Sequence, residues 1–592
     1  MNDASREPYR VCLEHLLELE APSRVARHDT SLYNFAPGVA ECAASHLGWT
    51  CLCSKPPTPA EELSSIATGI RNEGLEAVVL FGQGGSSQAS MTVTKLHEVS
   101  TGRSDVAFRT MDSLSPVFVN HILGSSDPAR TLYIVASKSG STIEPRLLER
   151  VAWEYVTNTI GVEDAAHRFV AITDPGTRLE LTARAKKYRL VLNSPVDVGG
   201  RFSALSVFSL FPAALVGIDI VKTVSSAQRV EASCVENDST NPALDLACFL
   251  YANYCEGRDK VSLVMPPSGQ VFGLWIEQLV AESLGKDGVG ILPNVEVDAS
   301  ILSIPRADRC SITYTVGHSE GFNESLENID ESIPARHYVL NTVEDLYRHF
   351  IIWEYAIAFL GILLKVNPFN QPDVDDTKRR VRQLLHEKCG SKTSSPSIKS
   401  SSADKEPDCL ELRFPSKEYV RLVRVSPALL NHGSKAEDIT SVDHALRALL
   451  ESIGVSDYFS LNAFLPFRDY GRREALERMR NRVASRLGAA SCLEIGPRYL
   501  HSTGQLHKGG PNTGVFLYLS ADEETDIETP GEDFTLGDLA AIQAQGDFEV
   551  NAARGRRAVQ VHLDSNDSET LSRFADRFCS AISAVKPVNT RL

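Results

Sequence analysis

The chain has 592 residues, enough for three or four domains, and its apolar (43%) and charged (23%) fractions are typical of a globular protein. Its formal net charge of −16 disfavours nucleic acid and anionic membranes as partners. A small anionic ligand is still possible, because a pocket needs only local positive charge.

The N-terminal residues carry acidic side chains early and contain no apolar run, so we expect no signal peptide. The most apolar segment, 350–366, is interrupted by Glu354, which favours a buried helix over a membrane span. The cysteines are scattered, and the spacing of Cys51 and Cys53 fits neither a zinc site nor a redox motif. We therefore expect a cytoplasmic protein with reduced thiols and no membrane partner.

Residues 1–70 have the apolar periodicity of amphipathic helices and no evident chemistry. The first buried strand is predicted at 77–81, and a glycine-rich turn follows it. Gly84, Gly85 and Ser86 in this turn would let the backbone approach a ligand closely. A tight strand-to-helix turn without a ligand explains the same pattern equally well.

The stretch 131–156 predicts a buried strand (133–136), a hydroxyl-rich turn and a helix in which Pro145 suits the first turn. The free N–H groups at the start of that helix, together with rotatable hydroxyls and one lysine, favour a phosphate site. An ordinary helix cap is the alternative, although caps use fewer hydroxyls. The turn consists of Ser137, Lys138, Ser139, Gly140, Ser141 and Thr142.

Two further strands are predicted at 169–173 and 188–193, alternating with helices. This alternation indicates a doubly wound parallel sheet, which binds ligands at the carboxyl ends of its strands. The two loops described above follow such ends and could line one crevice. Paired glycines then precede Arg201 and a helix at 205–216, which favours an arginine aimed into the site over a surface arginine.

A second strand–helix series begins at 261–265, with its helix at 272–283. Glu282 lies seven residues after Trp275, so it continues the buried stripe of this helix. A carboxylate in the last helical turn opposes the helix dipole, and general-base chemistry is one reason to keep it there. Pairing with Lys286 is the alternative.

A long apolar helix is predicted at 343–365, followed by a turn at 367–374 and a basic helix that carries Lys378 near its start. On sequence alone, a solvated lysine is the better interpretation of Lys378. A polar, low-complexity linker follows, and a third α/β region has strands predicted at 419–425, 458–465, 515–519 and 559–563. A glycine-rich loop in that region contains His501 and His507, and its spacing gives poor support for a metal site.

Six stretches stand out along the chain: FGQGGSS, SKSGSTIEP, VGGRFS, AESLGK, PFNQP-x5-K and HSTGQLH. This set resembles the glucose-6-phosphate isomerase family, which has the sugar isomerase (SIS) fold. The first five fall in order across about residues 75–380. The match is closest to the isomerase half of fused transaldolase–glucose-6-phosphate isomerases, here expected as a separate protein, and GPRYLHSTGQLHKGGPNTG is its most specific part.

The resemblance implies interconversion of glucose 6-phosphate and fructose 6-phosphate through a cis-enediolate, as in glycolysis and gluconeogenesis. Glu282 would shuttle the proton between C1 and C2, and Arg201 would stabilise the enediolate. Gln371 and Lys378 would contact the sugar, with Lys378 helping ring opening. The turn at 84–86 would line the substrate site, and the residues implied to hold the sugar phosphate are Ser137, Lys138, Ser139, Ser141 and Thr142.

The resemblance also implies that His507 opens the sugar ring. In ordinary family members, however, the histidine motif precedes the Gln…Lys motif, whereas here it follows it. Either the C-terminal region completes the site or the histidine assignment is wrong, and His501 is the alternative.

The implied fold class is α/β, with two SIS-type doubly wound parallel-sheet domains at 1–225 and 226–386, a linker at 387–408 and a C-terminal α/β region at 409–592. The implied ligand is a small sugar phosphate, and no metal or organic cofactor is implied. The protein is expected to be either a homodimer or a monomer. Two alternatives stay open: an isomerase that also accepts mannose 6-phosphate, and a non-catalytic sugar-phosphate-binding regulator. A regulator would need the phosphate loop but not Glu282, Arg201 and Lys378.

Overall fold

The computed structural model describes residues 3–102, 105–296, 298–317, 320–390, 409–415, 418–433, 435–467 and 470–586. The chain divides into two compact units. Unit 1 comprises Met1–Asp112 and Ile122–Asn370, and unit 2 comprises Ser113–His121 and Gln371–Leu592. The four segments expected from the sequence, 1–225, 226–386, 387–408 and 409–592, stay a prediction. Residues 387–390 of the expected linker end a helix, α16 (Val374–Gly390), and residues 391–408 lie outside the described residues.

The N-terminal segment of unit 1 is helical, as predicted. Its apolar faces pack inward, so that α1 lies against α12 and α4 against α10. Its helices are α1 (Asp3–Glu18), α2 (Ala21–Ala26), η1 (Thr30–Tyr33), α3 (Val39–Ala44), η2 (Gly48–Cys51) and α4 (Ala60–Asn72).

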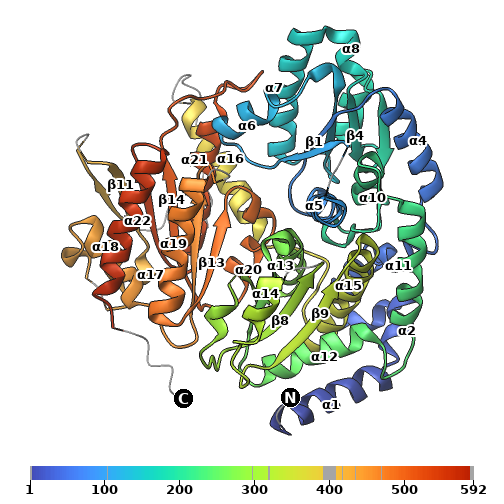
Figure 1. Cartoon of the computed structure of the whole chain (residues 1–592). Helices are drawn as coiled ribbons and strands as arrows, with labels where there is room; N and C mark the ends of the chain where they lie inside the picture. The colour runs from blue at the N-terminus through green and yellow to red at the C-terminus, as the bar shows by residue number, and fades with distance from the viewer. Residues whose placement is uncertain are drawn as a thin grey trace. The chain divides into compact units, whose positions relative to one another are not determined.

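The first sheet of unit 1, whose strands β1 and β4 are labelled in Figure 1, is parallel, with strand order β2-β1-β3-β4-β5. Right-handed connections leave β1 and β3 in opposite directions, so α5 covers one face of this sheet and α7 and α9 cover the other. The doubly wound prediction is therefore confirmed. The strands are β1 (Ala77–Phe81), β2 (Ala107–Met111), β3 (Thr131–Ala136), β4 (Phe169–Thr173) and β5 (Leu190–Asn193). The helices of this part of unit 1 are η3 (Gly84–Ser86), α5 (Gln88–Thr101), η4 (Pro128–Arg130), α7 (Ile143–Ile160), α8 (Val162–Ala166), α9 (Arg178–Ala185), η5 (Gly200–Phe202) and α10 (Val207–Leu215). The helix between β2 and β3 in the chain, α6 (Pro116–Leu123), belongs mostly to unit 2.

The second sheet of unit 1 is also parallel, with order β7-β6-β8-β9. Only its first strand was predicted from the sequence. The strands are β6 (Lys260–Val264), β7 (Leu292–Glu296), β8 (Arg309–Val316) and β9 (Ala335–Leu340). The helices are α11 (Ile220–Cys234), α12 (Pro242–Cys255), η6 (Pro267–Gly269), α13 (Gln270–Leu284), η7 (Ala299–Leu302), α14 (Glu320–Leu326) and α15 (Val343–Leu364).

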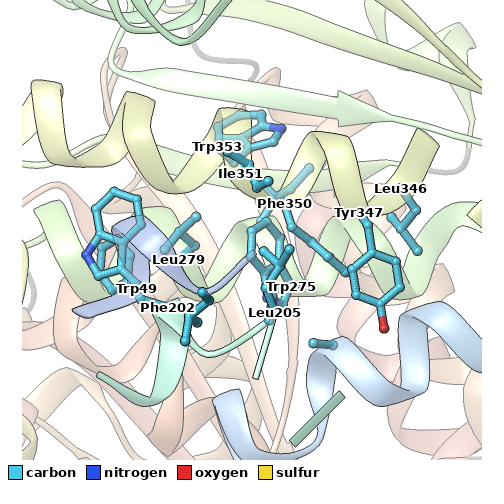
Figure 2. Packing of buried hydrophobic residues seen from close by; sticks show 14 of the residues in the cluster. Trp49, Phe202, Leu205, Trp275, Leu279, Leu346, Tyr347, Phe350, Ile351 and Trp353 are labelled. Atoms are coloured by element: carbon cyan, nitrogen blue, oxygen red, sulfur yellow. The ribbon is translucent and has the colours of Figure 1, made fainter. Parts of the chain in front are cut away.

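One hydrophobic core joins the two sheets of unit 1, because α13 packs against both α5 and α15. Figure 2 shows its aromatic centre, where the ring centroids of Trp275 and Phe350 are 4.5 Å apart. Phe202 stacks on Trp49 at 5.1 Å, which anchors the short helix η5 to this core. α15 is long and apolar enough to cross a membrane by length and composition, and 78% of its apolar window is buried in the protein.

Unit 2 contains a six-stranded mixed sheet, so the predicted C-terminal α/β region is confirmed. Its order is β10-β11-β15-β14-β12-β13, with antiparallel pairing at β10–β11–β15 and parallel pairing elsewhere. The strands are β10 (Leu410–Arg413), β11 (Val420–Val425), β12 (Tyr458–Phe464), β13 (Ala490–Ile495), β14 (Gly514–Ala521) and β15 (Arg557–Leu563). The helices after α16 are α17 (Pro427–Leu430), η8 (Ala436–Asp438), α18 (Val442–Glu451), α19 (Tyr470–Leu487), η9 (Arg498–His501), α20 (Gly504–Gly509), α21 (Leu536–Ala553) and α22 (Ser568–Ser583).

Candidate active site

The glycine-rich turn after β1 packs against the turn that carries Arg201. Gly84 has a left-handed backbone with φ of 53°, which glycine adopts without steric cost. A Cβ atom on Gly85 would lie 2.0 Å from the backbone oxygen of Gly200, so only glycine fits there. Ser86 is buried in the same turn. Because β1 and β3 are paired neighbours, the loop after β3 lies at the same edge of the sheet.

The loop after β3 carries several hydroxyl groups at the start of α7. Ser139 and Ser141 are exposed, and their oxygens are 2.9 Å apart. Ser137 donates a hydrogen bond to the Thr142 hydroxyl at 3.3 Å. Thr142 occupies the N-cap position, but its side chain accepts no capping hydrogen bond from α7. An ordinary helix cap therefore does not account for these hydroxyls.

Lys138 is anchored within the protein. Its ammonium group donates hydrogen bonds to both carboxylate oxygens of Asp174 and to the backbone oxygen of Pro195, all at 2.8 Å. A lysine has three N–H donors, so these bonds occupy all of them. This geometry suits a side chain that braces the loop better than one that holds a ligand directly.

Arg201 is 5% exposed and makes a fork of hydrogen bonds. Its Nε donates to the Ser283 hydroxyl at 2.7 Å, and one Nη donates to the backbone oxygens of Pro368 and Asn370 at 2.7 and 2.9 Å. Burial lowers the pKa of Arg201, and the carboxylate of Glu282 acts in the opposite direction. The guanidinium is thus held rigidly with one edge toward Glu282.

Glu282 lies in the last turn of α13 and is 8% exposed, as the helical spacing predicts. Its Oε1 is 3.5 Å from Nη1 of Arg201, and its Oε2 accepts a hydrogen bond from Gln278 at 3.0 Å. Lys286, the pairing partner considered from the sequence, donates instead to the backbone oxygens of Asn367 and Asn370, at 2.6 and 2.5 Å. Unit 1 therefore brings one oriented carboxylate and one fixed cation together, and such a pair can move a proton and stabilise the negative charge that develops.

The remaining sequence-predicted residues lie in unit 2. Gln371 is partly buried, and Lys378 is 47% exposed and pairs with Asp375 at 2.9 Å. The backbone N–H of Asp373 donates to Gln505 at 3.0 Å, which joins the Gln371–Lys378 stretch to the histidine loop within this unit.

His501 and His507 occupy different environments in unit 2. His501 is partly exposed, whereas His507 is 1% exposed. The His507 ring lies against those of Tyr458, Tyr499 and Phe516, and neither of its nitrogens has a hydrogen-bond partner among the described residues. Burial lowers the pKa of His507 to about 3. A neutral, enclosed imidazole is poorly placed to exchange protons with a ligand.

Comparisons with known proteins give a separate indication of the family. A family model described as phosphoglucose isomerase matches residues 61–300. A glucose-6-phosphate isomerase from Parabacteroides distasonis is 29% identical over 413 residues, which cover 60% of this chain and 90% of that protein. Another from Prochlorococcus marinus is 33% identical over 348 residues, or 52% of this chain and 66% of that protein. The chain belongs to the phosphoglucose isomerase family.

The fold of this phosphoglucose isomerase family member is also seen in a solved structure, that of a hypothetical protein from Thermus thermophilus. The two share 23% identity with a TM-score of 0.52, over 64% of this chain and 97% of that chain. Within the residues that the structure describes, no group of three or more His, Cys, Asp or Glu side chains is arranged to hold a metal ion.

Several residues around this phosphoglucose isomerase site were not singled out from the sequence. Gln278 is four residues before Glu282, so helical spacing could have identified it. The contacts of Cys42 and His46 could not be found in this way, because these residues lie in the N-terminal helical segment, far from the other site residues in the sequence. The Cys42 sulfur is 3.9 Å from Nδ1 of His46, and this hydrogen bond lowers the pKa of the thiol. The ring of His46 lies 6.5 Å from that of Phe369, beside the segment that Arg201 holds.

Proposed function

We propose that Glu282 and Arg201 carry the interconversion of glucose 6-phosphate and fructose 6-phosphate, the activity of the family to which the chain belongs. The contact between the carboxylate of Glu282 and the guanidinium of Arg201, 3.5 Å apart, is the observation that supports these roles most directly. With open-chain glucose 6-phosphate, Glu282 removes the proton at C2, and the electron pair forms the enediolate. A proton passes from the C2 hydroxyl to the oxygen on C1, and return of the carbon-bound proton from Glu282 to C1 then gives fructose 6-phosphate.

Arg201 faces the charge that develops on the enediolate oxygen. Because Ser283, Pro368 and Asn370 hold the guanidinium in place, it does not need to reorganise as the charge forms. Gln278 donates a hydrogen bond to Oε2 of Glu282 and so fixes the orientation of the carboxylate, which acts as the base. The protein thereby separates the two tasks of proton transfer and charge stabilisation.

The sugar phosphate is proposed to bind at the loop after β3, with Gly84, Gly85 and Ser86 alongside. Ser139, Ser141 and Thr142 supply hydroxyl donors, and α7 supplies the positive end of its dipole. Ser137 orients Thr142. Lys138 contributes positive charge to the loop while its ammonium braces Asp174 and Pro195.

The four residues in unit 2 are proposed from the family resemblance. Gln371 and Lys378 would contact the sugar, and a histidine would open its ring. The partial exposure of His501 and the complete burial of His507 favour His501 for ring opening. A cytoplasmic location, and a homodimeric or monomeric state, stay predictions.

A coupled assay tests the proposal: fructose 6-phosphate is supplied, glucose 6-phosphate is detected through its dehydrogenase, and EDTA is present. We expect turnover that EDTA does not reduce. If there is no turnover while fructose 6-phosphate still raises the melting temperature, the chain is a sugar-phosphate-binding regulator and the catalytic roles are wrong.

A further inference from the structure

Cys42 and His46 lie beside the candidate active site of unit 1 and have no part in the proposed reaction. Cys42 belongs to α3, and His46 is the second residue after the end of that helix. The two side chains are half-buried, so a small molecule can reach them from solution. The Cys42 sulfur lies 3.9 Å from Nδ1 of His46, which brings a thiol and an imidazole together at this place.

The ring of His46 lies between two segments that position Arg201. A Cβ atom on Gly199 would lie 3.5 Å from Cδ2 of His46, and Gly199 immediately precedes the short helix η5 that carries Arg201. The imidazole is nearly parallel to the ring of Phe369, with the ring centroids 6.5 Å apart. Phe369 belongs to the segment 368–370, whose backbone oxygens accept hydrogen bonds from Arg201. A chemical change at Cys42 or His46 would therefore occur next to the catalytic guanidinium.

The hydrogen bonds of His46 favour a negatively charged sulfur. Nδ1 carries a hydrogen, because it donates to the backbone oxygen of Cys42 at 2.8 Å, and the Ser45 hydroxyl lies 3.0 Å from the same nitrogen. This N–H also faces the Cys42 sulfur. Its hydrogen bond lowers the pKa of the Cys42 thiol and raises the pKa of His46, while burial of the thiol acts in the opposite direction. The positive charge of Arg201 lowers the pKa of the thiol further.

Other cysteines of unit 1 have different surroundings. Cys51 is half-buried like Cys42, but its thiol donates to the backbone oxygen of Gly48 at 3.6 Å, and burial raises its pKa. Burial also raises the pKa of the enclosed thiols of Cys234 and Cys310. Because the thiolate and not the thiol is the nucleophile, Cys42 should react before these three cysteines.

We propose that Cys42 is a modification site, at which hydrogen peroxide oxidises the sulfur to a sulfenic acid. The thiolate attacks one peroxide oxygen, so that an S–O bond forms as the O–O bond breaks. The sulfur loses two electrons and the peroxide gains them. The leaving hydroxide takes a proton from the imidazolium of His46 and departs as water, which leaves Cys42 as S–OH and His46 neutral.

Oxidation of Cys42 should inhibit the isomerase, and this consequence rests on the proposed function. A hydrogen bond from the side chain of Asn367 reaches the Cys42 sulfur, and the residues that follow, 368–370, hold the guanidinium of Arg201. The sulfenic acid is larger than the thiolate and is not charged. It should therefore displace this segment and remove a negative charge beside Arg201, which lowers turnover.

Mass spectrometry after treatment with hydrogen peroxide and dimedone, which traps sulfenic acids, tests the site without an activity assay. In the parent protein, dimedone should label Cys42 about tenfold faster than Cys51, because the thiolate reacts. His46→Gln should slow the labelling of Cys42 about tenfold, since glutamine neither stabilises the thiolate as a cation nor supplies the proton. Cys51→Ser is the matched control and should leave the labelling of Cys42 unchanged.

Equal labelling of Cys42 and Cys51 would overturn the proposal, and so would labelling of Cys42 in His46→Gln at the parental rate. The comparison of the two cysteines needs no variant, so it decides the matter even if His46→Gln does not fold.

The coupled isomerase assay tests the consequence, with each protein compared with its own untreated sample. Peroxide should remove most of the activity of the parent protein and of Cys51→Ser, and dithiothreitol should restore it, whereas Cys42→Ser should keep its activity. Inactivation of Cys42→Ser as fast as the parent would show that inhibition does not act through Cys42. If Cys42 is labelled selectively and the untreated parent has no turnover, the modification site stands and the proposed function fails.

Discussion

Replacing His507 with phenylalanine should make the protein less sensitive to acid. Burial lowers the pKa of His507 to about 3, and the positive charges of Lys508 and Arg556 act in the same direction. The carboxylate of Asp547 opposes them. In the unfolded chain the same imidazole has a pKa near 6.5. Its contribution to stability is therefore fully present above pH 6.5 and is lost as the pH falls toward 3, because only the unfolded chain takes up the proton.

The size of the effect follows from these two pKa values. At pH 5 the unfolded state gains about 2 kcal/mol from protonation of this one imidazole, and the loss grows by about 1.4 kcal/mol for each further pH unit. Phenylalanine keeps the aromatic contacts with Tyr458, Tyr499 and Phe516 and does not titrate. Urea unfolding at pH 8 and pH 5 should show that the parent protein loses about 2 kcal/mol more than His507→Phe.

Isomerase activity should persist in His507→Phe, because the ring is enclosed. Equal losses of stability in the two proteins on going from pH 8 to pH 5 would refute the reasoning about burial. A variant with parental stability and no turnover of the cyclic sugar phosphate would instead show that His507 opens the ring.

Three other substitutions have defined outcomes. Arg201→Lys should lower kcat by about 10²–10³-fold in steady-state assays, since one ammonium cannot replace the fixed guanidinium fork, and an unchanged kcat would contradict the role given to Arg201. Asp174→Asn should raise the KM for fructose 6-phosphate more than it changes kcat, because Lys138 loses the carboxylate that anchors it; a change in kcat alone would argue against a binding role for the loop. Asp547→Asn should lower the free energy of unfolding by about 3–5 kcal/mol, because Lys508 is fully buried beside it, and a urea midpoint equal to the parent's would count against this pair.

The sequence predicts strands best where every side chain is apolar and buried. β1, β3 and β4 are short apolar runs, and the strand-to-loop-to-helix pattern after β3 is evident from local spacing. β9 alternates between exposed and partly buried residues, and β2 is only partly buried. β8 is fully buried but contains Arg309, Ser311 and two threonines, so its hydrophobic signal is weak. The formation of β2, β8 and β9 depends on burial by distant parts of the chain, which a short stretch of sequence does not reveal.

In the candidate site too, local sequence spacing predicted some features, whereas others depend on tertiary packing. Glu282 could be placed on the buried face of its helix because the period of 3.6 residues requires it, and the glycines before Arg201 suggested a directed guanidinium. The pairing of Lys138 with Asp174, 36 residues away, depends on where two neighbouring strands end, so this pairing could not be predicted from local sequence spacing. The difference in burial between His501 and His507, six residues apart in one loop, likewise follows from packing that sequence spacing does not determine.

The most direct test of proton transfer by Glu282 compares Glu282→Gln with Glu354→Gln in the coupled assay, while the melting temperature records fructose 6-phosphate binding. Both glutamates are buried in unit 1, but burial raises the pKa of Glu354 well above its usual value, so glutamine replaces an already neutral group there. We predict that Glu282→Gln loses about 10²–10⁴-fold in kcat yet keeps the fructose 6-phosphate-induced rise in melting temperature, and that Glu354→Gln retains both. Parental turnover in Glu282→Gln would contradict the account, because the proton would then have to move through another group.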